Sequence, residues 1–219
     1  MLGTSCSDEI LEKLPKDQLT VTTTFTTNSN FETYAWSMYA NAFPGYWDLT
    51  PINREMGSDL LVNNAGTQGD ALLWQRKTVP SSSSLWNNAF VNIRRANLML
   101  DNIDGSQLTD GEKQHWRGVG LFFRAYEYVQ LIANYGEVPW VDKSLTEVDE
   151  DILYGPKTSR DQLSQNVLDD LLEAESIINP DGSGPNTVNT DVVRALISRF
   201  GLYEGTWRKY HGLGDETRY

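Results

Sequence analysis

Cysteine and histidine are scarce in this sequence of 219 residues. The single cysteine, Cys6, excludes an internal disulfide framework, so the packing of apolar side chains has to hold the fold together. The two histidines, His115 and His211, lie far apart in the sequence, which disfavours a histidine-built metal site. We therefore predict a fold that uses no cross-links, metals or cofactors.

Positive charge is also in short supply. The chain has 18 Lys and Arg residues against 30 Asp and Glu residues, a net charge of −12. A surplus of this sign repels the phosphates of nucleic acid and argues against docking on an anionic lipid surface. No apolar run approaches the roughly 20 residues that a transmembrane helix needs. With 39% hydrophobic residues, the chain is predicted to form one globular domain that buries roughly 70% of its unfolded surface.

Motifs for catalysis are missing as well. The sole cysteine is terminal, and no G-x-S-x-G nucleophile elbow occurs. The glycine-rich segment 181–185 ends in a proline, where a phosphate-binding loop would need an N–H donor. With 30 acidic residues, a chance pair of carboxylates resembling a glycosidase site is almost guaranteed. The acidic residues on predicted helices are explained as caps or solvated faces: Glu112, Glu127, Asp169 and Asp170. We predict that the protein is not an enzyme.

The stretch from Thr109 to Pro139 has the strongest pattern in the chain. Thr109 and Glu112 form a capping box at its start, and Gly136 followed by Pro139 supplies a left-handed cap and a stop. Two glycines inside the predicted helix, Gly118 and Gly120, each cost roughly 1 kcal/mol relative to alanine. Close approach of a neighbouring helix would explain them. Apolar residues recur at helical spacing between these signals: Trp116, Val119, Phe123 and Tyr126.

Four more helices are predicted from the same signals. The first is capped by Asn28 or Ser29 and ends at Pro44-Gly45. The second runs from 81–84 to Ile103, and its short connection to the 109–139 helix makes the two antiparallel. A third opens with a capping box of Ser159 and Gln162, and a last one is capped by Thr190. The fold class is therefore all-α, mainly helical. Residues predicted to lie inside include Leu85, Trp86, Trp116, Phe123 and Leu171, and Arg124 is predicted to pair with Glu127 three residues on.

The segment 45–83 is irregular but rich in aromatic residues, which is typical of functional loops rather than disordered ones. Sugars are recognised by flat aromatic faces together with planar amide, carboxylate and guanidinium groups. The segment offers both kinds, and its candidate ligand-binding residues are Trp47, Asp59, Asn63, Asn64, Trp74 and Arg76. Trp74 follows Leu72-Leu73, so a place in the core stays open for it.

Several segments, in order, resemble the SusD/RagB family of outer-membrane nutrient-binding lipoproteins from Bacteroidetes-type bacteria. The family pattern "flRAf-yf-l---yG-vPl" is similar to residues 123–139, and further segments match family patterns within the first, second, third and last predicted helices and in the irregular segment 45–83. The matching segments lie at 30–39, 57–59, 86–97, 158–174 and 195–207. These matches follow the family order and are spread over residues 28 to 211.

This resemblance implies a fold architecture and a cellular location. The helices would form antiparallel, tetratricopeptide-like pairs with long irregular loops, although no clean 34-residue repeat is visible. Residues 1–27 would be a lipoprotein tether and extended segment, with Cys6 as the lipid anchor after the small residues that precede it. Residues 28–219 would be the N-terminal helical domain, without the C-terminal half of the family. The protein would be anchored to the outer membrane and exposed on the cell surface.

The resemblance also implies a function. It predicts a nutrient-binding protein, with a glycan or an oligopeptide as ligand and a glycan favoured, that acts with a SusC-like TonB-dependent outer-membrane transporter. The alternative is a helical scaffold for protein–protein interaction without a small ligand. Binding of a sugar by the aromatic residues of segment 45–83 would separate the two.

Overall fold

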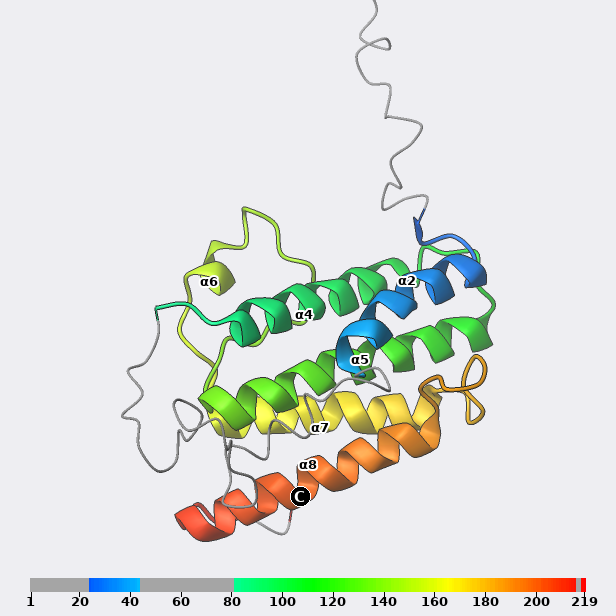
Figure 1. The fold of residues 1–219 in the computed structure, drawn as a ribbon. Coiled ribbons are helices and arrows are strands. Elements are labelled where there is room, and N and C mark those ends of the chain that lie inside the picture. The colour runs from blue at the N-terminus through cyan, green and yellow to red at the C-terminus, as the bar shows by residue number, and fades with distance from the viewer. Residues whose placement is uncertain (1–23, 44–80, 216–217) are drawn as a thin grey trace, which may run out of the picture.

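The computed structural model describes residues 24–43, 81–215 and 218–219. The described part is helical, with no strand and one isolated bridge between Val138 and Thr158. Four long helices follow one another in space as they do in the chain, each packed on the next, and a shorter first helix lies across two of them (Figure 1). Their bounds are α2 Asn28–Ala42, α4 Ser84–Asn102, α5 Asp110–Tyr135, α6 Glu150–Leu153, α7 Arg160–Ile177 and α8 Thr190–His211. The all-α fold of antiparallel helix pairs is confirmed.

Helix α5 is the central element, because α2, α4, α7 and α8 all contact it. Its capping box forms as predicted: Thr109 N–H donates to Glu112 Oε2 at 2.8 Å, and Glu112 N–H donates to Thr109 Oγ1 at 3.4 Å. At the other end, Gly136 has a φ of 73° and donates its N–H to Ile132 O. Its ψ of −75° lies outside the left-handed helical region, so the prediction was right about positive φ and wrong about the type of cap.

Residues of neighbouring helices lie close to two glycines inside α5, Gly118 and Gly120. A Cβ on Gly118 would come within 2.9 Å of Ile178 Cβ, and one on Gly120 would come within 2.8 Å of Leu100 Cδ2. Real Cβ atoms do not make contacts this short, so a side chain at Gly118 would press on the backbone at the end of α7, and one at Gly120 would displace the Leu100 side chain of α4. The predicted reason for their cost in helix propensity is confirmed.

Helix starts were predicted less well. The cap of α2 is Thr27, which makes no side-chain cap bond. Asn28, the predicted cap, instead accepts the indole N–H of Trp116 at 2.7 Å. The cap of α8 is Asn189, one residue before Thr190. Ser159 does cap α7, but the Gln162 side chain donates to Asn166 Oδ1. Since several residues near a helix start can accept the free N–H groups, the choice depends on tertiary partners.

The core is continuous across these helices. Trp116, Phe123 and Leu171 are buried as predicted. Trp86 is only half-buried, and Leu85, which was predicted to face inward, is exposed. The first turn of α4 therefore lies at the edge of the core. None of the described helices is long and apolar enough to span a membrane.

The prediction for Arg124 was wrong. Its guanidinium makes two bonds of 2.7 Å to Asp170 on α7 and none to Glu127. The fixed fork of a guanidinium matches both oxygens of one carboxylate, and Asp170 presents them in that way across the helix interface. Glu127 instead accepts a bond of 2.9 Å from the Asn92 amide on α4. Burial raises the pKa of Glu127 to about 7, against the opposing effect of the Asn92 bond.

Candidate functional site

The ligand-binding residues predicted from the sequence, Trp47, Asp59, Asn63, Asn64, Trp74 and Arg76, lie outside the described residues. So does Cys6, the predicted lipid anchor. The structure therefore does not test these predictions. Within the described part, a different concave surface is a candidate for ligand binding.

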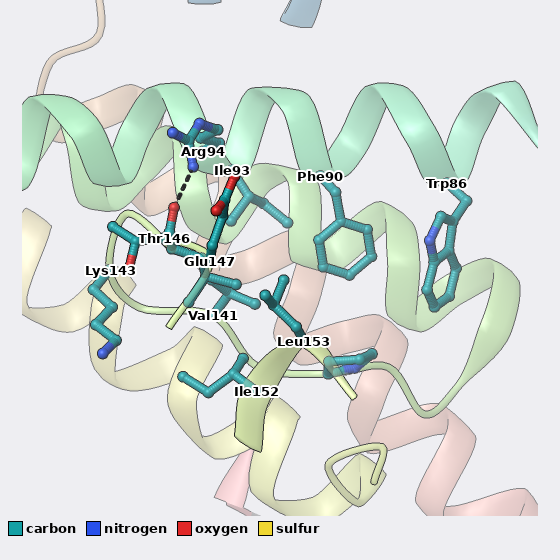
Figure 2. Close-up of a pocket in the computed structure, with 12 residues that line it drawn as sticks. Trp86, Phe90, Ile93, Arg94, Val141, Lys143, Thr146, Glu147, Ile152 and Leu153 are labelled. Carbon is teal, nitrogen blue, oxygen red and sulfur yellow. Dashed lines mark hydrogen bonds between the residues drawn. The ribbon is translucent and has the colours of Figure 1, made fainter. Parts of the chain in front are cut away.

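This surface is a groove of about 720 Å³ between α4 and the segment that follows α5. We call residues 139–147 the strap. The strap forms one wall of the groove, α4 forms the opposite wall, and Ile152 and Leu153 of α6 close the remaining side (Figure 2). Ligand sites in proteins have volumes of roughly 300–1,000 Å³ and combine an apolar lining with a few polar groups. The groove fits this description.

The α4 wall consists of Trp86, Phe90, Ile93 and Arg94. Their spacing of four, three and one places them on one face of the helix. The rings of Trp86 and Phe90 lie 5.0 Å apart at 48°, and Tyr135 meets Trp86 edge-on at 5.1 Å. These contacts fix the two side chains as an aromatic corner at one end of the groove.

The strap wall shows an alternation like that of a β-strand. Up to Leu145, its odd-numbered residues line the groove: Pro139, Val141, Lys143 and Leu145. The consecutive Thr146 and Glu147 follow them in the lining. The even-numbered Trp140 turns toward the helical body, where its ring lies 4.4 Å from Tyr128 and 5.3 Å from the Arg124 guanidinium. An extended backbone sends successive side chains to opposite sides. The strap thus turns Trp140 toward the helical body, where it is half-buried, and presents the residues on either side of it to the groove.

Side chains of the helices hold the strap backbone in place. The Tyr128 hydroxyl accepts from Val141 N–H at 2.7 Å and donates to Pro139 O at 3.1 Å. The Asn97 amide donates to Val141 O at 2.9 Å and to Lys143 O at 3.1 Å. Ser144 N–H donates to Asp101. These bonds satisfy backbone groups that have no partner within a sheet or helix.

Arg124 joins the strap to the core. Besides its ion pair with Asp170, the guanidinium donates to Asn97 Oδ1 at 3.0 Å and to Asp142 O at 2.9 Å. Burial raises the pKa of Asp170, and the Arg124 guanidinium opposes that rise. Arg124 and Asp170 are both buried. A single buried cation therefore contacts α4, α7 and the strap.

The end of the groove opposite Trp86 is charged. Arg94 donates to Leu145 O at 2.7 Å, and Glu147 also lines the groove (Figure 2). Lys143 and Thr146 both donate to Asp149, and these bonds lower the pKa of that carboxyl to about 2 while the Lys143 pKa rises. The groove therefore runs from an aromatic corner, over an aliphatic middle, to a rim of charged side chains.

This arrangement suits binding rather than covalent chemistry. The described residues contain no group of three His, Cys, Asp or Glu side chains that could hold a metal ion. A ring can lie against Trp86 and Phe90, while Arg94 and Glu147 offer a donor and an acceptor for hydroxyl groups. Sequence reasoning placed Trp86 in the core and did not find the groove.

Comparison with known proteins gives one family. A family model named SusD-like, described as starch-binding and associating with the outer membrane, matches residues 9–202. No curated protein sequence matches the chain at a significant level.

Solved structures share the fold. A SusD-like protein from Bacteroides fragilis is 24% identical, with a TM-score of 0.70 over 92% of this chain and 38% of its own. A laminarin-binding SusD-like protein is 17% identical, with a TM-score of 0.61 over 82% of this chain and 40% of its own. Surface glycan-binding protein A from Bacteroides uniformis is 17% identical, with a TM-score of 0.64 over 85% of this chain and 44% of its own. The chain thus spans less than half the length of each of these structures.

Proposed function

The chain belongs to the SusD-like family, and we propose that it binds a glycan at the cell surface and passes it, uncut, to a SusC-like TonB-dependent transporter in the outer membrane. The observation that carries this proposal is the family match over residues 9–202, to a family described as starch-binding and outer-membrane associated. A binding role without catalysis agrees with that description. Two relatives of the same fold, by their names, bind laminarin or surface glycan.

The groove supports the ligand class. Pyranose rings have apolar C–H faces that stack on aromatic side chains, and hydroxyl edges that bond to planar polar groups. The aromatic corner of Trp86 and Phe90 offers the first kind of contact, and the rim of Arg94 and Glu147 offers the second. We propose that the groove contributes to the glycan site together with the predicted loop 45–83, in which Trp47 and Trp74 would stack on sugar rings.

The test is calorimetry of the complete protein against starch- and laminarin-derived oligosaccharides. A stacked aromatic side chain contributes roughly 0.5–1.5 kcal/mol beyond its buried area. Trp47→Ala, Trp74→Ala and Phe90→Ala are therefore each expected to weaken binding about tenfold, because 1.4 kcal/mol is one decade of affinity. The control is Trp36→Ala, which removes an exposed tryptophan of α2 outside the groove.

The outcomes separate the two classes of function. Glycan binding, with the oligosaccharide recovered uncut, supports the proposal. No heat with any glycan in the panel would leave the helical scaffold for protein partners as the better description. Binding that survives Trp47→Ala and Trp74→Ala but not Phe90→Ala would place the sugar in the groove and remove loop 45–83 as a platform.

The proposed location at the outer membrane depends on Cys6. We propose that it carries the lipid anchor and that residues 7–27 form the tether. One acyl chain gives only marginal membrane binding, so a stable anchor needs several chains on this residue. Expression of the full-length gene with Cys6→Ala in its host should release the protein from the outer-membrane fraction. Retention equal to that of the wild type would refute the anchor, and Cys6→Ser controls for the size of the side chain.

A further inference from the structure

Side chains, and not other backbone groups, hold the strap backbone in place. Its backbone groups from Pro139 to Leu145 bond to side chains instead of other backbone groups, and the partners are Tyr128, Thr158, Asn97, Arg124, Asp101 and Arg94. Most of these partners lie on α4 and α5, which are packed against each other. The helices therefore hold the strap through its backbone, in addition to the packing of Val141 in the core.

The buried partners do not line the groove. Tyr128, Asn97 and Arg124 are buried beneath the strap and are absent from the groove lining. Each of these three side chains bonds to a backbone atom of a strap residue. Neighbouring side chains of the strap line the groove. A wall held in this way needs no ordering when a ligand arrives, which saves conformational entropy on binding.

We infer that Tyr128, Asn97 and Arg124 are positioning residues that hold the strap as a preformed wall of the groove, and that the groove-facing side chains on this wall, Glu147 among them, select the glycan. The inference rests on the proposed function, since it names how the same groove discriminates between sugars. It divides the residues into two sets with different expected effects. Loss of a positioning residue weakens every ligand by a common factor, whereas a change in a selecting residue alters the preference between ligands.

Tyr128→Phe is the sharpest test of the positioning set. It removes one hydroxyl and leaves Val141 N–H and Pro139 O without their partner. The matched control is Tyr39→Phe, which removes a buried hydroxyl that accepts from Val188 N–H at 2.8 Å, away from the strap. Both variants leave a buried N–H unpaired, so a general loss of stability affects them alike. Only Tyr128→Phe should loosen the backbone of the strap.

Two readouts distinguish positioning from a structural role. By amide hydrogen exchange in the complete protein, Tyr128→Phe should speed exchange at Val141 about tenfold relative to the wild type, which is the effect of losing one hydrogen bond. By calorimetry with maltoheptaose and laminarihexaose, it should weaken both by a common factor of about fivefold. Tyr39→Phe should change neither. Should Tyr128→Phe fail to fold, Asp101→Ala removes the acceptor of Ser144 N–H; it should speed exchange at Ser144 and weaken both sugars by a common factor.

Glu147→Gln tests the selecting set. The Glu147 side chain is exposed at the charged rim, and the substitution keeps its shape while removing its charge. It should leave strap exchange unchanged and alter the ratio of the two affinities about tenfold, since the two sugars present different hydroxyl groups and bonds to a charged acceptor are the stronger ones.

Some results would overturn the inference. These are wild-type Val141 exchange in Tyr128→Phe, an equal effect of Tyr39→Phe on the strap, or a common loss of both affinities in Glu147→Gln. If the wild type binds neither sugar, the proposed function fails instead, and hydrogen exchange alone decides whether the Tyr128 hydroxyl holds the strap.

Discussion

Replacing Arg124 with alanine is expected to lower the free energy of unfolding by about 3–5 kcal/mol, because it leaves a buried carboxylate without its cation. Asp170 would keep its burial and lose both bonds of 2.7 Å. Asn97 Oδ1 and Asp142 O would lose their donor in the same step. Chemical denaturation followed by circular dichroism measures the effect.

The pH dependence of this variant gives a second check. Burial raises the pKa of Asp170, and Arg124 opposes that rise, so the pKa should rise further when Arg124 is removed. A carboxyl whose pKa is higher in the folded than in the unfolded state loses stability as pH rises between the two values. The deficit of Arg124→Ala should therefore be larger at pH 7 than at pH 4. A deficit that is the same at both values would show that the variant loses packing and not charge compensation.

A double variant separates the pair from its surroundings. Arg124→Met with Asp170→Leu replaces both charges by apolar groups, and such replacements of a buried ion pair are often close to neutral. We expect the double variant to be more stable than Arg124→Ala. If it is equally unstable, the bonds from Arg124 to Asn97 and the strap, rather than the pair itself, account for the loss.

The sequence predicts local features of this fold well. The capping box of Thr109 and Glu112 depends on residues three apart, and the antiparallel course of α4 and α5 depends on a short connection. Gly118 and Gly120 could be interpreted because their cost in helix propensity needs a compensating contact. In each case the deciding partners are close in sequence, or the residue type itself shows that something lies nearby.

Contacts between segments that are distant in the chain could not be predicted from the sequence. Glu127 was the nearest carboxylate in sequence to Arg124, but the partner is Asp170, 46 residues away. Helical spacing showed that Trp86 and Phe90 lie on an apolar face, and it could not show that this face is left partly open beside the strap. Periodicity reports the polarity of a face and not what covers it. The predicted ligand residues in segment 45–83 remain a prediction.

Replacing Phe123 with alanine is expected to cost about 3–5 kcal/mol, as for other buried aromatic residues. Phe123 is 3% exposed, and its ring meets Tyr39 of α2 edge-on at 4.9 Å and Phe122 at 5.3 Å. Truncation would open a cavity where α2 packs on α5, and it would remove these ring contacts as well. The midpoint of denaturant unfolding should fall while the slope of the transition stays constant, since the slope follows the surface exposed on unfolding.

Phe43→Ala is the matched control for this prediction. Its ring also contacts Phe123, at 6.4 Å, but Phe43 is 42% exposed. Solvent already reaches much of the Phe43 ring, so its removal should cost about 1 kcal/mol or less, in the range of substitutions outside the core. A shift for Phe123→Ala no larger than that for Phe43→Ala would mean that α5 does not form the centre of the core. A large shift for Phe123→Ala alone would support the packing of α2 on α5 described by these contacts.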